Sequence, residues 1–322
     1  MLHFATLLDE AFVPRGLALH ESMLAHAPDA TLWVLCLDDL TAQVMTRLGR
    51  AGVRLLRLED LGEKHDVVRA DRTRREQYFA WKSFLARSVL RTQGVDRVTV
   101  VDGDMWFVSD PSPALEEIVQ SSVALTAHRS GDDAFERRFG RFNAGFVSFR
   151  DDVAGHEAVD WWVDRCVEAT PDYPVDGRFG EQRYLDDLAD RHGTVVMAHP
   201  GVNVAPWNLG RMDLTERSGH LLVDGRPLVC FHFHGAERWR RGVFAFRSGV
   251  SARDALVRRL LLAPYVAAWE RGAAAAAGVG ATIRFPAPWG GTRKRPPWWR
   301  AARVAARGVN AIASGRVLIH HD

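Results

Sequence analysis

The sequence contains little cysteine and little lysine. Its three cysteines, Cys36, Cys166 and Cys230, are too few and too scattered for a disulfide framework, and none has the spacing of a metal site. This scarcity favours a reducing compartment, so we expect a cytoplasmic protein. Lysine occurs only at positions 64, 82 and 294 among 42 basic residues, a bias that we attribute to GC-rich coding rather than to function.

Long apolar runs are also missing. The apolar stretch 260–277 is interrupted by Pro264 and by the charged pair 270–271, so no segment predicts a transmembrane helix. At the N-terminus, no basic region precedes an apolar stretch, and residues 3–8 predict a first strand. We therefore expect no signal peptide.

The near-neutral net charge of +2 conceals an asymmetry between two parts of the chain. Residues 278–322 carry eight basic residues and one acidic residue, which leaves the remainder with a net charge of −5. A mildly acidic main body disfavours a nucleic-acid-binding protein, because such proteins present a basic surface to the phosphate backbone.

Short apolar runs alternate with helical patterns along the chain. This alternation predicts βαβ units and an α/β fold with a parallel sheet. The expected strands are 3–8, 31–37, 53–58, 97–102, 123–128, 144–149, 194–198, 220–223 and 228–233. The expected helices are 14–27, 40–50, 75–92, 112–119, 154–168, 179–191 and 251–270.

The composition shifts after residue 270 towards alanine, glycine and proline. We therefore expect one compact domain over residues 1–270 and a basic C-terminal tail over 271–322, with proline, glycine and tryptophan. Within the tail, residues 296–309 combine two tryptophans with arginines at helical spacing. This stretch either lies on an anionic membrane surface or is a basic tail without a partner.

An acidic pair follows the apolar run 97–101, in the sequence Asp102-Gly103-Asp104. Ligands of open α/β sheets bind beyond the carboxyl ends of the strands. Two carboxylates separated by a glycine can converge there on a hard divalent cation such as Mg²⁺ or Mn²⁺. The alternative is a solvated acidic turn.

Two histidines, His232 and His234, lie in a second apolar run near the end of the expected domain. Strand alternation places both on the same face, where a neutral imidazole can complete a metal site. The alternative is a pair of half-buried histidines in a sheet. A zinc site is disfavoured, because it needs three or four nitrogen or sulfur ligands and no cysteine is suitably spaced.

Four motifs in this order resemble the GT-A nucleotide-sugar glycosyltransferases, in particular the family 8-like members. They are Asp102-Gly103-Asp104, Asn143-Ala144-Gly145-Phe146, Glu181-Gln182 and the late His232-x-x-Gly235. The resemblance spans residues 3–240 and implies a Rossmann-like α/β/α sandwich with a mostly parallel central sheet. It further implies metal-dependent transfer of a sugar from a nucleotide-diphosphate sugar to an acceptor hydroxyl, with retention of anomeric configuration.

The resemblance assigns a Mn²⁺ or Mg²⁺ ion to Asp102, Asp104 and His232, with the ion bridging the sugar diphosphate. Gly235 belongs to the same motif. At the position where the family has a lysine that contacts the diphosphate, this sequence has Arg238. Arginine also neutralises phosphate, but through a planar fork rather than a point charge.

The resemblance places the nucleotide, with UDP expected, against Thr6 and Asp9 at the end of the first strand. It assigns the donor sugar and the reacting carbon to four residues, namely Asn143, Gly145, Glu181 and Gln182. Glu181 stands where the family usually has aspartate.

Lys82 lies in the helix before the metal motif and has two interpretations. Either it faces the donor, or it belongs to a solvated helix face with Trp81 in the core. The turn-rich segment 199–208 is similarly either a wall of the acceptor site or a structural connection anchored by Trp207.

The sequence specifies no acceptor, so glycans, lipid-linked molecules and proteins all remain candidates, while nucleic acid is not expected. The expected location is the cytoplasm, with contact to the inner face of the membrane if the tail binds there. Two other functions stay open. A nucleotidyltransferase shares such a sheet, but residues 9–14 lack its usual glycine-rich basic loop. A non-catalytic module would bind metal or nucleotide only.

Overall fold

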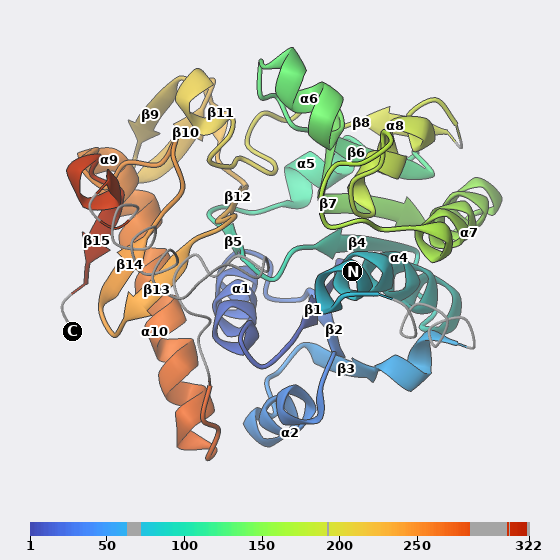
Figure 1. Ribbon diagram of the computed structural model, residues 1–322, viewed down its shortest axis with the longest axis horizontal. Coiled ribbons are helices and arrows are strands. Elements are labelled where there is room, and N and C mark those ends of the chain that lie inside the picture. Colours follow the sequence, from blue (N-terminus) through green and yellow to red (C-terminus); the bar gives the residue numbers. More distant parts are fainter. Residues whose placement is uncertain (63–71, 192, 284–307, 309, 321–322) are drawn as a thin grey trace.

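The structure is a computed structural model that describes the chain except for residues 63–71, 192, 284–307, 309 and 321–322 (Figure 1). Its central sheet has seven strands in the order β3-β2-β1-β4-β7-β6-β8. They are β1 (His3–Leu8), β2 (Thr31–Cys36), β3 (Val53–Arg57), β4 (Arg97–Val101), β6 (Val123–Ala127), β7 (Phe142–Arg150) and β8 (Thr194–Val196). Only β7 runs antiparallel to its neighbours β4 and β6. The predicted α/β fold with a mostly parallel sheet is confirmed.

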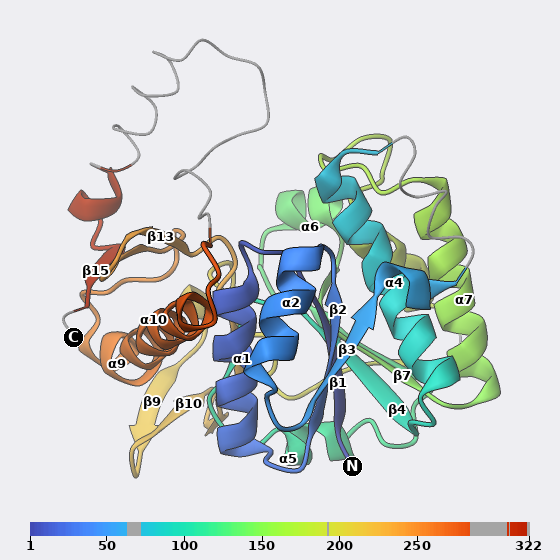
Figure 2. The same cartoon turned by 90° about the horizontal axis from the view of Figure 1, so that it is seen from below.

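Helices cover both faces of this sheet (Figures 1 and 2). On one face lie α4 (Arg74–Thr92) and α7 (Val153–Glu168), and on the other lie α1 (Val13–His26) and α2 (Asp39–Leu48). Strand β1 supplies both cores, because successive side chains of a strand point to opposite faces. Ala5 belongs to the core under α4 and α7, whereas Phe4 and Leu8 belong to the core under α1 and α2.

The two helices that border the predicted site begin at polar caps. At the start of α4, the Thr73 hydroxyl accepts from the Glu76 amide (3.3 Å), and the Glu76 carboxylate accepts from the Thr73 amide (2.9 Å). At the start of α7, the Asp152 carboxylate accepts from the Gly155 amide (2.7 Å). These bonds satisfy amides that the first helical turn leaves without partners.

A second part of the fold packs beside the sheet and follows β8 in the sequence. Strand β12 (Cys230–His232) pairs with β5 (Met105–Phe107), which follows the acidic motif. Helix α10 (Ala263–Gly278) lies against α1, and a Cβ on Gly272 would stand 2.5 Å from the Pro14 carbonyl oxygen. Small residues in α10 therefore allow the two helices to approach closely.

The other elements are short. They are α5 (Ser112–Glu116), α6 (Asp133–Phe139), α8 (Leu185–Leu188), α9 (Ala255–Val257), β9 (Leu214–Arg217), β10 (His220–Val223), β11 (Arg226–Pro227), β13 (Glu237–Arg240), β14 (Val243–Ala245) and β15 (Val317–Ile319). Strands β9 to β11 form one antiparallel sheet, and β13 to β15 form another.

Two predicted helices differ in the structure. The helix expected over 179–191 is a 3₁₀ turn at Gln182–Tyr184 followed by α8, and Gly180 before it has a φ of +53°, which is outside the helical region. The helix expected over 251–270 instead begins with α9 and a π turn at Arg258–Leu262 and continues as α10 to Gly278. The predicted domain boundary at residue 270 thus falls inside α10, and the two-part division of the chain stays a prediction.

Candidate active site

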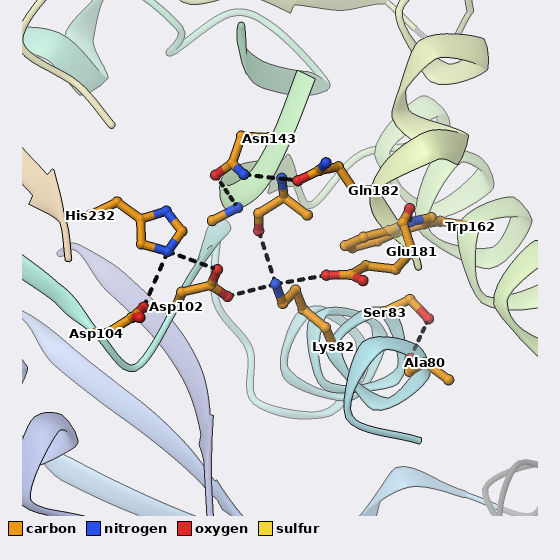
Figure 3. Close-up of polar contacts among 12 residues, drawn as sticks. Ala80, Lys82, Ser83, Asp102, Asp104, Asn143, Trp162, Glu181, Gln182 and His232 are labelled. Carbon is orange, nitrogen blue, oxygen red and sulfur yellow. Dashed lines mark hydrogen bonds and ion pairs between the residues drawn. The ribbon is translucent and has the colours of Figure 1, made fainter. Parts of the chain in front are cut away.

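The acidic motif and the first of the two histidines meet at the carboxyl end of β4. Asp102 follows β4 directly, and Asp104 follows the turn at Gly103. His232 Nε2 lies 3.4 Å from Asp102 Oδ2 and 3.2 Å from Asp104 Oδ1 (Figure 3). One ligand atom from each of the three residues lies within 4.8 Å of the others. The three predicted metal ligands therefore face one point.

The electrostatics of this cluster fit a cation. Burial works against a charged imidazole, yet Asp104 and Asp102 outweigh it and raise the pKa of His232. Burial likewise works against a charged Asp104, but the neighbouring imidazole outweighs it and lowers the pKa of that carboxyl. Two carboxylate oxygens and one imidazole nitrogen form a donor set that suits Mn²⁺ or Mg²⁺.

The ring of His232 is held from two sides. A Cβ on Gly145 would lie 2.8 Å from His232 Nδ1, so only glycine leaves room for the ring there. The ring of His232 also packs edge-to-face against the ring of Trp207, with ring centroids 5.3 Å apart. Both Gly145 and Trp207 thus restrain the imidazole rather than bind the ion.

Lys82 on α4 links the metal cluster to the Glu181-Gln182 motif. Its Nζ lies 2.5 Å from Asp102 Oδ1 and 2.7 Å from Glu181 Oε1 (Figure 3). The side chains of Lys82 and Glu181 are 9% and 3% exposed. Burial opposes the charge on Lys82, but the two carboxylates outweigh it and raise the pKa of the amine. Burial raises the pKa of Glu181. Lys82 therefore faces the cluster, and Trp81 beside it is in the core.

Asn143 and Gln182 form a chain of amide hydrogen bonds. Asn143 Nδ2 donates to Gln182 Oε1 (2.8 Å), which also accepts from the Ala144 amide (3.3 Å). Gln182 Nε2 donates to the Phe139 carbonyl (2.7 Å). Because the backbone amide and carbonyl fix which end donates, the orientation of the Gln182 side chain is determined.

The same chain of hydrogen bonds continues into the segment 199–208. Asn203 Nδ2 donates to Asn143 Oδ1 (3.0 Å) and to Thr126 Oγ1 (2.7 Å). Asn203 is buried and has a φ of +54°. Asn203 could not be recognised from the sequence, since an asparagine in a turn-rich segment gives no sign of a left-handed conformation or of distant partners.

The predicted nucleotide residues line a cavity next to the cluster. The cavity measures about 170 Å³ and is bordered by Thr6, Leu7, Asp9, Phe12, Leu37, Tyr78, Phe79, Lys82, Asp102, Gly103, Asp104, His232 and His234. The Asp9 carboxylate accepts from Tyr78 (2.7 Å) and pairs with Arg74 (3.2 Å). The Thr6 hydroxyl is buried without a hydrogen-bond partner among the described residues.

The structure does not place Arg238 on this cavity. Arg238 instead forms a two-pronged ion pair with Glu270 of α10, with nitrogen–oxygen distances of 2.9 and 2.8 Å. Gly235 is close to the cluster along the chain, and its φ is +67°. The structure therefore brings together the predicted metal ligands, Lys82 and the end of β1. The Arg238 side chain instead points towards α10.

No helix among the described residues is long and apolar enough to cross a membrane. The predicted amphipathic stretch 296–309 lies outside the described residues, apart from Gly308.

Comparison with known proteins identifies relatives by sequence. No protein-family model matches the chain. The uncharacterised protein YfnF of Bacillus subtilis is 31% identical over 245 residues, which are 72% of this chain and 80% of YfnF. The uncharacterised YfnD of the same organism is 27% identical over 241 residues, 72% of this chain and 77% of YfnD.

Solved structures share the fold at lower identity. The galactosyltransferase LgtC, in complex with donor and acceptor sugar analogues, aligns with a TM-score of 0.56 and 14% identity, over 93% of this chain and 99% of LgtC. The glycosyltransferase GlyE of Streptococcus pneumoniae aligns with a TM-score of 0.51 and 13% identity, over 88% of this chain and 66% of GlyE. The fold is thus that of the GT-A glycosyltransferases.

Proposed function

Because the chain belongs to the same protein family as YfnF of Bacillus subtilis and has the fold of the GT-A glycosyltransferases, we propose that it is a glycosyltransferase. It takes a sugar from a nucleotide-diphosphate sugar and transfers it to an acceptor hydroxyl. The observation that carries this proposal is the convergence of Asp102, Asp104 and His232 on one point beyond the carboxyl end of β4.

These three residues would hold Mn²⁺ or Mg²⁺. When bound, such an ion acts as a Lewis acid on the diphosphate that leaves the sugar. The protein contributes a buried, fixed set of ligands, since Asp104 and His232 are 8% and 2% exposed. Ligands that are already oriented need little reorganisation when charge develops on the leaving group.

The nucleotide is proposed to occupy the cavity beside β1. Thr6 offers a buried hydroxyl that has no partner among the described residues, and Asp9 offers a carboxylate held in place by Tyr78. Both groups suit the hydroxyls and amides of a nucleoside, and UDP is our expected nucleotide. The cavity itself is smaller than a whole nucleotide sugar, so the sugar would extend from the metal towards Asn143 and Gly145.

Lys82, Glu181 and Gln182 are proposed to organise the reacting centre. Lys82 holds the Glu181 carboxylate next to the metal ligand Asp102. The amide of Gln182 is engaged at both ends, by Asn143 and by the Phe139 carbonyl, so it presents a fixed dipole beside the donor-sugar pocket. A fixed dipole stabilises developing charge better than a mobile one.

We propose retention of anomeric configuration. An inverting enzyme needs a carboxylate base near the acceptor hydroxyl. Among the described residues that border the cavity, the carboxylates are Asp9, Asp102 and Asp104, and each is engaged by Tyr78, Lys82 or His232. Asp186 on α8 pairs with Arg183 and accepts from the Arg141 amide (2.9 Å).

The acceptor is proposed to be a glycan, a lipid-linked molecule or a protein in the cytoplasm. LgtC, which shares the fold, has been crystallised with an acceptor sugar analogue, which supports a carbohydrate acceptor. We also propose contact with an anionic membrane through the stretch 296–309, of which the structure describes only Gly308.

The proposed function can be tested by the release of nucleoside diphosphate from UDP-, GDP- and dTDP-sugars. We expect release with Mn²⁺, none with excess EDTA, and a loss of at least 100-fold in the folded variant Asp104→Asn, because that change removes a charged metal ligand. Asp133→Asn, which alters an exposed carboxylate of α6, serves as the matched control and should keep full activity. Normal activity of Asp104→Asn, or no release by the unaltered protein from any of these sugars, would contradict the proposal.

A further inference from the structure

Three arginines surround the loop 233–236, which follows the metal ligand His232. They are Arg15 on α1, Arg238 on β13 and Arg247, which lies two residues after the end of β14. A cation near this loop matters for a nucleotide-sugar enzyme, because the loop borders the cavity through His234. The contacts of the three arginines decide which of them is available to a ligand.

The side chains of two of these arginines, Arg238 and Arg15, are held by partners within the protein. Arg238 and Glu270 form a nearly buried ion pair, with side chains 13% and 12% exposed, and Glu270 also accepts from the Gly242 amide (2.8 Å). The Arg15 guanidinium lies 4.3 Å from the ring centres of both Phe12 and Trp269. Arg15 also donates to the Ala236 carbonyl (2.9 Å), so it anchors the loop to α1.

Arg247 differs in both exposure and contacts. It is exposed, and its guanidinium makes no hydrogen bond or ion pair with the described part of the chain. Its side chain nevertheless lies across the loop, since a Cβ on Gly235 would stand 2.2 Å from Arg247 Nε and 3.0 Å from its Cγ. A glycine is thus required at position 235 for two reasons. Its φ of +67° disfavours other residues, and a Cβ would occupy the space through which the Arg247 side chain passes.

The charges of the site leave a bound diphosphate without a counter-ion, which Arg247 can supply. Asp102, Asp104 and Glu181 carry negative charge, and Lys82 together with a divalent cation would balance it. A bound diphosphate would therefore bring negative charge without a protein counter-ion. A guanidinium suits that role, because its planar fork binds two phosphate oxygens at once.

We propose that Arg247, passing over Gly235, is the residue that neutralises the donor diphosphate, while Arg238 holds β13 against α10 through Glu270. This inference rests on the proposed function. It also gives Gly235 a specific role, which is to leave the space through which Arg247 reaches the metal side of the loop.

Binding of inorganic pyrophosphate in the presence of Mn²⁺, measured by calorimetry on the full chain, tests the proposal without knowledge of the base, sugar or acceptor. We expect Arg247→Ala to weaken pyrophosphate binding at least tenfold and Arg247→Lys to weaken it less. Gly235→Ala should have an effect similar to Arg247→Ala, because the new methyl group displaces the arginine. Binding of Mn²⁺ alone, followed by electron paramagnetic resonance, should change less than threefold in both Arg247 variants.

Two controls separate this role from a general loss of charge or of fold. Arg217→Ala removes an exposed arginine of β9 and should change pyrophosphate binding less than threefold. The pair Arg238→Met with Glu270→Gln removes both buried charges together, keeps an acceptor for the Gly242 amide, and should also change binding less than threefold.

Equal pyrophosphate binding by Arg247→Ala and the unaltered protein would overturn the inference and leave the proposed function intact. A tenfold loss in the Arg238 pair with none in Arg247→Ala would assign the role to Arg238 instead. If the unaltered protein binds neither Mn²⁺ nor pyrophosphate, the proposed function fails together with the inference.

Discussion

Replacing Lys82 by methionine tests the centre of the site through protein stability. The Lys82 amine is buried between Asp102 and Glu181, at 2.5 and 2.7 Å. Lys82→Met keeps most of the apolar stem but leaves the Glu181 carboxylate, which is 3% exposed, without its counter-ion. A buried charge that loses its partner is strongly destabilising, whereas removal of both charges is often close to neutral.

The expected cost follows from this geometry. Breaking a buried pair from one side typically costs about 3–5 kcal/mol. For a chain of this size, such a loss lowers the melting temperature by about 4–7 °C. The double variant Lys82→Met with Glu181→Gln should recover more than half of the loss. The carboxylate that remains beside position 82 is Asp102, which is 26% exposed and also lies 3.4 Å from His232 Nε2.

Thermal unfolding followed by circular dichroism in EDTA measures these differences without any contribution from metal. Arg91→Met is the matched control, because Arg91 pairs with Asp160 on the surface, where the side chains are 46% and 41% exposed. An exposed pair contributes about 0–1 kcal/mol, so this variant should melt close to the unaltered protein. If Lys82→Met were no less stable than Arg91→Met, the assignment of Lys82 as a buried counter-ion would be wrong.

Two further predictions concern a glycine and a histidine. Gly145→Ala should weaken Mn²⁺ binding at least tenfold in a resonance titration, because its Cβ would lie 2.6 Å from Asn143 Oδ1 and 2.8 Å from His232 Nδ1. Gly210→Ala, where no atom lies within 4 Å, should have no effect. Burial is the main cause that lowers the pKa of His128 to about 4. At this residue the unfolded chain therefore binds more protons between about pH 6.5 and 4, so His128 should contribute a fall in stability of about 2 kcal/mol from pH 7 to pH 5 in urea titrations. His128→Gln should make the total fall in stability smaller by about that amount, and an unchanged dependence of stability on pH would disprove the assignment.

The parts of the fold that the sequence predicts best are those set by local periodicity. Strands β1, β2 and β4 are mostly apolar runs, and α4 and α7 begin at polar caps. These signals lie within a few neighbouring residues. The expected helix at 179–191 fails because its residues are held by distant partners, such as Trp162 donating to the Glu181 carbonyl (2.9 Å).

The metal ligands could be anticipated because each lies at a strand end, where an α/β sheet collects its ligands. The contact between Lys82 and Glu181 could not, since the two residues come from separate elements whose distance depends on how α4 packs on the sheet. Arg238 shows the opposite case. Its place after the His232-x-x-Gly235 motif indicated a phosphate contact, but strand pairing in β13 turns its side chain towards Glu270.

The amide chain around Gln182 explains why such a site resists prediction even when its members are named. Asn143 and Gln182 lie on different elements, and Asn203 joins them only because its backbone adopts a left-handed conformation. None of the three has a charge or a periodic position that reveals a partner. Yet the fixed backbone donors at Ala144 and Gly145 determine the direction of every bond in the chain. The orientation of Gln182 is therefore a property of the packed β7 region, and it exists only once the sheet and the segment 199–208 have come together.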